Sequence, residues 1–177
     1  MMSRLGVIQV GPETDCSLKA LKESIELVFP WLKVESVTTL KDVDEAFDSQ
    51  RNQYHSTRIL ALLEKQIRSL SVEKLLGVAP VDLFVPGMNF VFGEARLPGH
   101  VGIISTHRLR PQSPSDNELF QERVIKEAVH EIGHMSGLRH CADSVCAMHF
   151  SEHIGDTDRK HAEFCSSCRS QLEAATR

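Results

Sequence analysis

Histidine and cysteine are concentrated in one stretch of this chain. Its 177 residues include nine His and five Cys, and ten of these fourteen residues lie between His130 and Cys168. An even distribution would place only about three of them there. Because imidazole and thiolate groups are common zinc ligands, we expect metal binding to constrain how this stretch folds.

The overall composition is that of one ordinary globular domain. With 41% hydrophobic residues, a chain of this length can bury a core without disulfides or a metal. The net charge of −4 argues against nucleic-acid binding, and no apolar run approaches the roughly 18 residues that cross a membrane. Residues 1–10 lack the features of a signal peptide. We therefore expect a cytoplasmic protein whose cysteines bind metal rather than form disulfides.

Alternating strands and helices are predicted in the first two thirds of the chain. A helix capped by Asp15 is stopped by Pro30, and a second helix carries apolar residues at helical spacing from Ile59 to Leu70. The strand candidates are residues 5–10, 32–39, 81–85, 89–95 and 101–106, of which the last two would form a hairpin. This alternation predicts an α/β fold with a partly parallel sheet.

A further helix is predicted just before and within the stretch rich in His and Cys. Ser115 and Glu118 fit a capping box at its start, and apolar residues recur at helical spacing from Phe120 to Ile132. Gly137 suits a left-handed stop at its end.

This helix carries the pattern HExxHxxGxxH at residues 130–140. His130 and His134 lie one turn apart on one face and can share an ion, while Glu131 can reach a water without being a ligand. A turn at Gly137 can return His140 as a third ligand, which leaves one position of a tetrahedral zinc open for chemistry. Chance produces the bare HExxH pattern in about 4% of such sequences and the extended pattern in roughly 0.01%, which favours a metal site over two surface histidines on an amphipathic helix.

Three further features accompany this pattern. A Cys follows its last His directly, Cys-Ala-Met occupies residues 146–148, and Cys-Ser-Ser-Cys occupies residues 165–168. Residues 84–95, FVPGMNFVFGEA, complete the set. Together these features resemble the archaemetzincins, a family of zinc peptidases in the metzincin clan.

The resemblance implies two zinc ions per chain with different roles. The catalytic zinc would be bound by three histidines: His130, His134 and His140. Glu131 would be the general base and acid, and Met148 would lie in a turn beneath the metal. The structural zinc would be bound by the four cysteines of the stretch, Cys141, Cys146, Cys165 and Cys168. Four thiolates leave no open position for chemistry, which agrees with a structural role.

The resemblance also implies a fold. We expect a single metzincin-like α/β (α+β) domain with a twisted, mixed, mostly parallel sheet, a backing helix and an active-site helix. Residues 1–137 would form an N-terminal subdomain, and residues 138–177 a small zinc-stapled C-terminal subdomain.

Several residues of the stretch have alternative interpretations. The two residues of the Cys165-x-x-Cys168 pair could form a redox dithiol, although that motif normally opens a helix after a strand. Some metzincins place a Tyr near the metal to stabilise the oxyanion, but the only Tyr here is Tyr54. We hypothesise from proximity to the Met turn that His149 or His153 supplies this donor instead.

The function we expect is zinc-dependent hydrolysis of peptide bonds in a peptide or protein substrate. Water made acidic by zinc would lose a proton to Glu131, and an extended peptide would align along the strand at residues 89–95. The chain enters its first predicted strand by about residue 5, so we expect no inhibitory pro-segment. The alternative is a zinc-binding regulatory protein that keeps the scaffold with little or no proteolysis.

Overall fold

The computed structural model describes residues 2–113 and 115–175. Its centre is a five-stranded sheet in the order β2-β1-β5-β8-β7. The four parallel strands are β1 (Ser3–Gln9), β2 (Leu32–Ser36), β5 (Lys74–Ala79) and β8 (Val101–Ser105). The short strand β7 (Gly93–Ala95) pairs antiparallel with β8 and forms one edge of the sheet. The expected mixed, mostly parallel sheet is confirmed.

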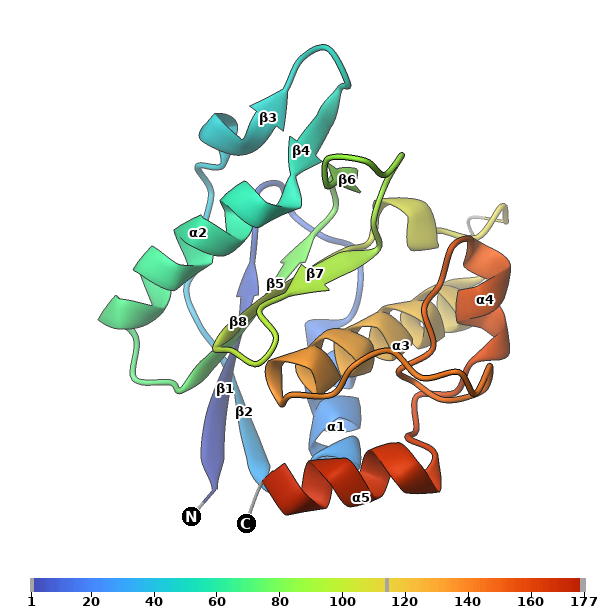
Figure 1. The fold of residues 1–177 in the computed structure, drawn as a ribbon. Coiled ribbons are helices and arrows are strands. Elements are labelled where there is room, and N and C mark those ends of the chain that lie inside the picture. Colours follow the sequence, from blue (N-terminus) through green and yellow to red (C-terminus); the bar gives the residue numbers. More distant parts are fainter. Residues whose placement is uncertain (1, 114, 176–177) are drawn as a thin grey trace.

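Helices cover both faces of this sheet (Figure 1). On one face lie α1 (Leu18–Val28) and α3 (Asn117–Met135), and on the other lies α2 (Ser56–Gln66). Two short helices follow α3, namely α4 (Ile154–Arg159) and α5 (Ser166–Ala175). Among the described residues, no helix combines the length and apolar character needed to cross a membrane.

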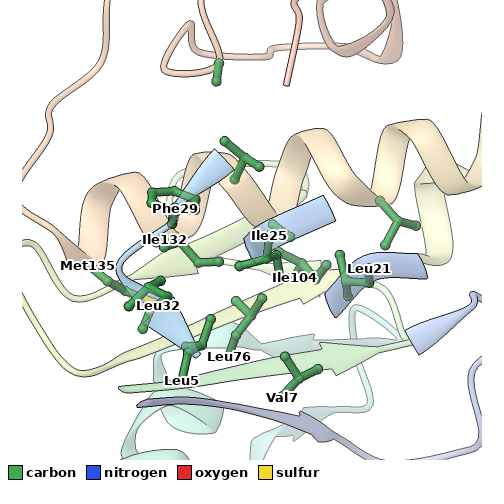
Figure 2. Packing of buried hydrophobic residues seen from close by; sticks show 14 of the residues in the cluster. Leu5, Val7, Leu21, Ile25, Phe29, Leu32, Leu76, Ile104, Ile132 and Met135 are labelled. Atoms are coloured by element: carbon green, nitrogen blue, oxygen red, sulfur yellow. The ribbon is translucent and has the colours of Figure 1, made fainter. Parts of the chain in front are cut away.

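The core is divided by the sheet because successive side chains of a strand point to opposite faces. Leu5 and Val7 of β1 pack with α1 and α3, whereas Ile8 packs on the face covered by α2. Figure 2 shows the first of these clusters, in which Leu21 and Ile25 of α1 contact the sheet beside α3. The segments after α3 join the same cluster through seven buried residues: Leu138, Cys146, Ala147, Met148, Phe164, Cys168 and Leu172. The division into subdomains at residues 137 and 138 stays a prediction.

A small second sheet lies at the carboxyl ends of the central strands. It contains β3 (Phe47–Asp48), β4 (Gln53–His55) and β6 (Leu83–Phe84) in the order β3-β4-β6. Short one-turn helices at Asp44–Ala46, Ile67–Ser69 and His107–Leu109 connect the larger elements.

Several predicted boundaries were wrong. The strand predicted at 81–85 is shorter than expected, since only β6 forms there, and it lies outside the central sheet. The central sheet instead contains β5, which was not predicted. The strand predicted at 89–95 is ordered as β7 only at its end, although its hairpin with β8 is confirmed. The first helix is capped by Ser17 rather than Asp15, because Asp15 pairs with Arg110.

The start and end of α3 differ in how well they match the prediction. Asp116, not Ser115, caps the helix, because its carboxylate accepts the amide N–H of Leu119 at 3.1 Å. Gly137 adopts φ +98° just after the helix, so the predicted left-handed stop is confirmed.

Candidate functional site

Three histidines converge at the C-terminal end of α3. His130 and His134 lie one turn apart on the helix, and His140 lies in the segment that follows Gly137. The ring centroids are 4.6 to 5.3 Å apart, and one potential ligand atom from each residue lies within 4.8 Å of the others. We call these residues the three-histidine cluster. The turn after α3 thus returns the third imidazole to the two on the helix.

Hydrogen bonds determine which nitrogen atoms face the centre of this cluster. Nδ1 of His130 lies 2.7 Å from the carbonyl oxygen of Ala147, and Nδ1 of His134 lies 2.7 Å from that of Leu138. A carbonyl oxygen only accepts, so each Nδ1 donates and each Nε2 keeps a free lone pair. The two Nε2 atoms are 3.0 Å apart.

Two lone pairs at that distance repel each other unless a proton or a cation lies between them. Burial lowers the pKa of His130 well below its usual value and also lowers the pKa of His134, which disfavours the proton. Neutral imidazoles whose Nδ1–H groups bind carbonyl oxygens are the usual form of zinc-binding histidines. The donor set of the three-histidine cluster therefore fits zinc.

Glu131 is buried beside this cluster with a free carboxyl oxygen. Its Oε2 atom has no hydrogen-bond partner among the described residues. Burial, and after it the negative charge of Glu127, raise the pKa of Glu131 well above its usual value. The backbone of β7 approaches so closely that a Cβ atom on Gly93 would lie 2.5 Å from Oε1 of Glu131. The absence of a side chain at Gly93 thus makes room for the Glu131 carboxyl group, whose raised pKa marks it as a candidate functional group.

Met148 lies fully buried under α3. A Cβ atom on Gly133 would overlap with the Met148 sulfur, so this sulfur packs directly against the helix between the two helical histidines. The neighbouring Ala147 carbonyl accepts from His130, and the Cys141 N–H donates to the Met148 carbonyl at 2.9 Å. The turn at Met148 therefore connects the helix to the segment that follows it.

Four cysteines form a second group, which we call the four-cysteine cluster: Cys141, Cys146, Cys165 and Cys168. Their Sγ atoms lie within 4.8 Å of one another. The Cys141 and Cys165 sulfurs are 3.8 Å apart, well beyond the roughly 2.05 Å of a disulfide. Because four thiols converge rather than two, this geometry fits tetrahedral zinc better than a redox dithiol. Cys16 is buried near the start of α1 and belongs to neither cluster.

The three-histidine cluster and Glu131 line a cavity of about 370 Å³, which we call the histidine cavity. One wall is β7 and the segment before it, and another is the segment 150–152 that follows the Met148 turn. Most of the wall side chains are apolar, namely Val85, Met88, Phe90, Val91, Phe92, Ala95, Leu97 and Phe150. Glu94 also lines the cavity, and hydroxyl groups at the start of α2, on Ser56 and Thr57, donate to its carboxylate.

A buried ion pair lies next to this cavity. Lys160 is fully buried, and its Nζ lies 3.0 Å from Oε1 of Glu127, which lines the cavity one turn before Glu131. The Thr157 hydroxyl donates to the same oxygen at 2.9 Å. No spacing pattern in the sequence marks this pair, because Glu127 lies on α3 and Lys160 directly follows α4, and the two meet only in the folded chain.

Neither of the two hypothesised oxyanion donors, His149 and His153, is among the residues that line the histidine cavity. His149 Nδ1 lies 3.1 Å from the Cys141 carbonyl oxygen. Tyr54, the only Tyr, lies on β4 beside a separate polar cavity. The His153 side chain is 66% exposed and caps α4. Sequence reasoning did not single out Ser151, which lines the cavity.

Comparison with known proteins places this site in a family. The model of peptidase family M54 matches residues 19–174. The archaemetzincin of Pyrococcus furiosus is 37% identical over 98% of this chain and 94% of its own length. The archaemetzincin of Archaeoglobus fulgidus is 44% identical over 72% of this chain and 74% of its own length.

Solved structures agree with the sequence comparison. The crystal structure of archaemetzincin from Methanopyrus kandleri superposes with a TM-score of 0.87 at 32% identity, covering 98% of this chain and 95% of that one. The malonate complex of the Archaeoglobus fulgidus archaemetzincin gives a TM-score of 0.82 at 38% identity, covering 94% and 99%. This chain therefore belongs to peptidase family M54, the archaemetzincins, and is a zinc metallopeptidase.

Proposed function

We propose that the chain hydrolyses peptide bonds in the histidine cavity, with the three-histidine cluster holding a catalytic zinc. The facing Nε2 lone pairs of His130 and His134, 3.0 Å apart, support this assignment. When bound by three imidazoles, zinc supplies Lewis-acid polarisation of a carbonyl group and makes water more acidic. The peptidase family implies a peptide or protein substrate.

Glu131 is the proposed general base and acid. The observation that carries this role is its Oε2 atom, which is buried, without a partner among the described residues, and beside the three-histidine cluster. A free carboxylate oxygen can take a proton from water as the water attacks the carbonyl carbon. The same group can return the proton to the amine nitrogen as the C–N bond breaks.

An extended substrate would pair with the free edge of β7. This strand is the last in the sheet, and all three of its residues, Gly93–Ala95, line the histidine cavity. Backbone pairing at a sheet edge aligns a peptide without regard to its side chains. The scissile bond would then lie in the histidine cavity beside β7, near the three-histidine cluster and Glu131.

The four-cysteine cluster would hold a second, structural zinc. Four thiolates complete a tetrahedral site and leave no position for water or substrate. This zinc would join the start of α5 to the turn at Met148 and so support the histidine cavity from below. None of the five cysteines, all of which lie in the described part of the chain, forms a disulfide, which favours a reducing compartment such as the cytoplasm.

The test is to measure zinc per chain and then screen a peptide library with wild type and Glu131→Gln. We expect two zinc ions in both proteins and a loss of at least about 10²-fold in kcat in the variant, since general base catalysis contributes roughly 10² to 10⁴. Glu118→Gln, on the exposed first turn of α3, is the matched control and should cleave normally. Two bound zinc ions without any cleavage by wild type would favour a zinc-binding regulatory protein instead.

A further inference from the structure

Ser151 lies in the wall of the histidine cavity and carries a hydroxyl group that no described residue binds. Its Oγ atom is inaccessible to solvent and has no hydrogen-bond partner among the described residues. A hydroxyl can donate one hydrogen bond and accept two. Leaving such a group buried and unpaired costs roughly 1–3 kcal/mol. This cost suggests that the hydroxyl has a partner in a state of the protein that includes substrate.

Two of the three histidines in the cavity wall have already committed their side-chain donors. Among the residues that line it, the only other side chains with N–H or O–H groups are those of the three-histidine cluster and any carboxyl group that is protonated. Nδ1 of His130 and Nδ1 of His134 donate to backbone carbonyl groups. No Lys, Arg, Tyr, Asn or Gln side chain is among these lining residues. Apart from His140, which is a proposed zinc ligand, Ser151 is thus the neutral side chain among these lining residues whose donor has no hydrogen bond.

The backbone around Ser151 is held on both sides. Before it, the His149 N–H donates to the Cys146 carbonyl at 2.9 Å within the turn that contains Met148. After it, the N–H groups of Glu152 and His153 lie 3.1 and 3.3 Å from Oδ2 of Asp156, which receives both bonds.

The helix that follows Ser151 is itself anchored to α3. Nε and Nη2 of Arg123 donate to the two carboxylate oxygens of Asp158 at 2.7 and 2.8 Å. The Lys160–Glu127 pair adds a second contact between the same two segments. A donor fixed in this way needs little reorganisation to stabilise charge that develops in its neighbourhood.

We propose that the Ser151 hydroxyl donates a hydrogen bond to the carbonyl oxygen of the scissile peptide as that oxygen gains negative charge. This role rests on the proposed function. As the water oxygen bonds to the carbonyl carbon, the π electron pair moves to the carbonyl oxygen, and the water proton goes to Glu131. When the C–N bond breaks, the pair re-forms the carbonyl and the proton passes to the amine. The hydroxyl hydrogen bond is strongest while the oxygen is charged.

The kinetic test compares Ser151→Ala with wild type. Removal of one such donor typically lowers kcat by about 10² to 10³, so we expect a loss of about 10²-fold in kcat with KM changed less than about threefold. Because the hydroxyl has no partner in the folded protein, Tm should not fall and zinc content should not change. Ser170→Ala, on the exposed face of α5, should match wild type. An unchanged kcat, or losses of Tm and zinc that parallel the loss of kcat, would overturn the proposal.

A binding measurement gives an answer that does not depend on cleavage. The probe is an Ala-Ala phosphinic pseudopeptide, whose tetrahedral anionic group resembles the charged state of the attacked carbonyl. Calorimetry should show binding to wild type that is about tenfold weaker in Ser151→Ala. Equal affinity for the two proteins, or no binding to wild type, contradicts the role of Ser151. Wild-type activity in Glu131→Gln would instead contradict the proposed function, so the two failures are distinguishable.

Discussion

The three-histidine cluster and the four-cysteine cluster alternate along one short stretch yet differ in what they leave unused. The histidines face a cavity whose wall contains two polar atoms without partners among the described residues, on Glu131 and Ser151. The four sulfurs converge on one another, and two of the four cysteines are buried. The difference teaches that uncommitted polar groups, more than the presence of ligand atoms, distinguish a site suited to chemistry from one suited to structure.

The chain reaches both clusters from adjacent residues. His140 and Cys141 are neighbours but belong to different clusters, and Cys146 lies two residues from Met148, which packs under α3. An isolated backbone β-bridge between Cys141 and His149 holds the two ends of this loop together. The geometry of the three-histidine cluster is therefore expected to depend on the four-cysteine cluster.

The largest expected effect comes from opening the four-cysteine cluster. In Cys165→Ser, loss of a thiolate should lower zinc content from two to about one per chain, and Tm should fall by more than about 10 °C, because structural zinc contributes directly to folding. Cleavage should be lost as the loop moves. Metal analysis and calorimetry measure both effects.

Cys16→Ser is the matched control for that variant. Cys16 is buried but lies outside both clusters, so its replacement should cost about 1 kcal/mol and leave zinc content unchanged. If Cys165→Ser retains two zinc ions and the wild-type Tm, the proposed structural zinc is wrong.

The second largest effect is expected from the contact between α3 and α4, which lies near the three-histidine cluster. Here a buried ion pair, Lys160 with Glu127, joins α4 to α3. Lys160→Met leaves the carboxylate buried without its cation, so we expect a loss of about 3–5 kcal/mol in the free energy of unfolding. Denaturant titration measures this loss.

The double variant Lys160→Met/Glu127→Gln separates charge from packing. It removes both charges, and it should recover most of the lost stability because no unpaired charge remains. A double variant as unstable as Lys160→Met would show that packing of the lysine chain, not the charge pair, matters there.

The parts of this structure that were predictable from the sequence depend on short-range spacing. His130 and His134 had to share a helix face because one turn separates them, and the glycine stop that follows was likewise local. The strand β5 was missed because it is short and buried on both faces, so it shows no alternation of polar and apolar residues.

The rest of the site depends on contacts between distant segments. Glu127 meets Lys160, and Ser151 enters the cavity, only because α4 packs on α3. None of these three residues belongs to a sequence motif or spacing pattern that would reveal its contacts. The same holds for Gly93, which matters because its backbone lies close to the Glu131 carboxyl group on α3. Replacing Gly93 gives the smallest of the predicted effects.

Gly93→Ala should lower activity while leaving both clusters intact. The added Cβ atom would lie 2.5 Å from Oε1 of Glu131 and 2.8 Å from the Ile103 carbonyl oxygen, so the carboxyl group must move. Neither contact involves a histidine or a cysteine, and zinc content should therefore stay at two. A displacement of a catalytic group by about 1 Å can cost roughly 10²-fold in rate, so we expect kcat to fall by 10-fold to 10²-fold. Wild-type kcat in this variant would mean that the Glu131 carboxyl does not need the position it has here, and a loss of zinc would mean that the two clusters are less separable than their geometry indicates.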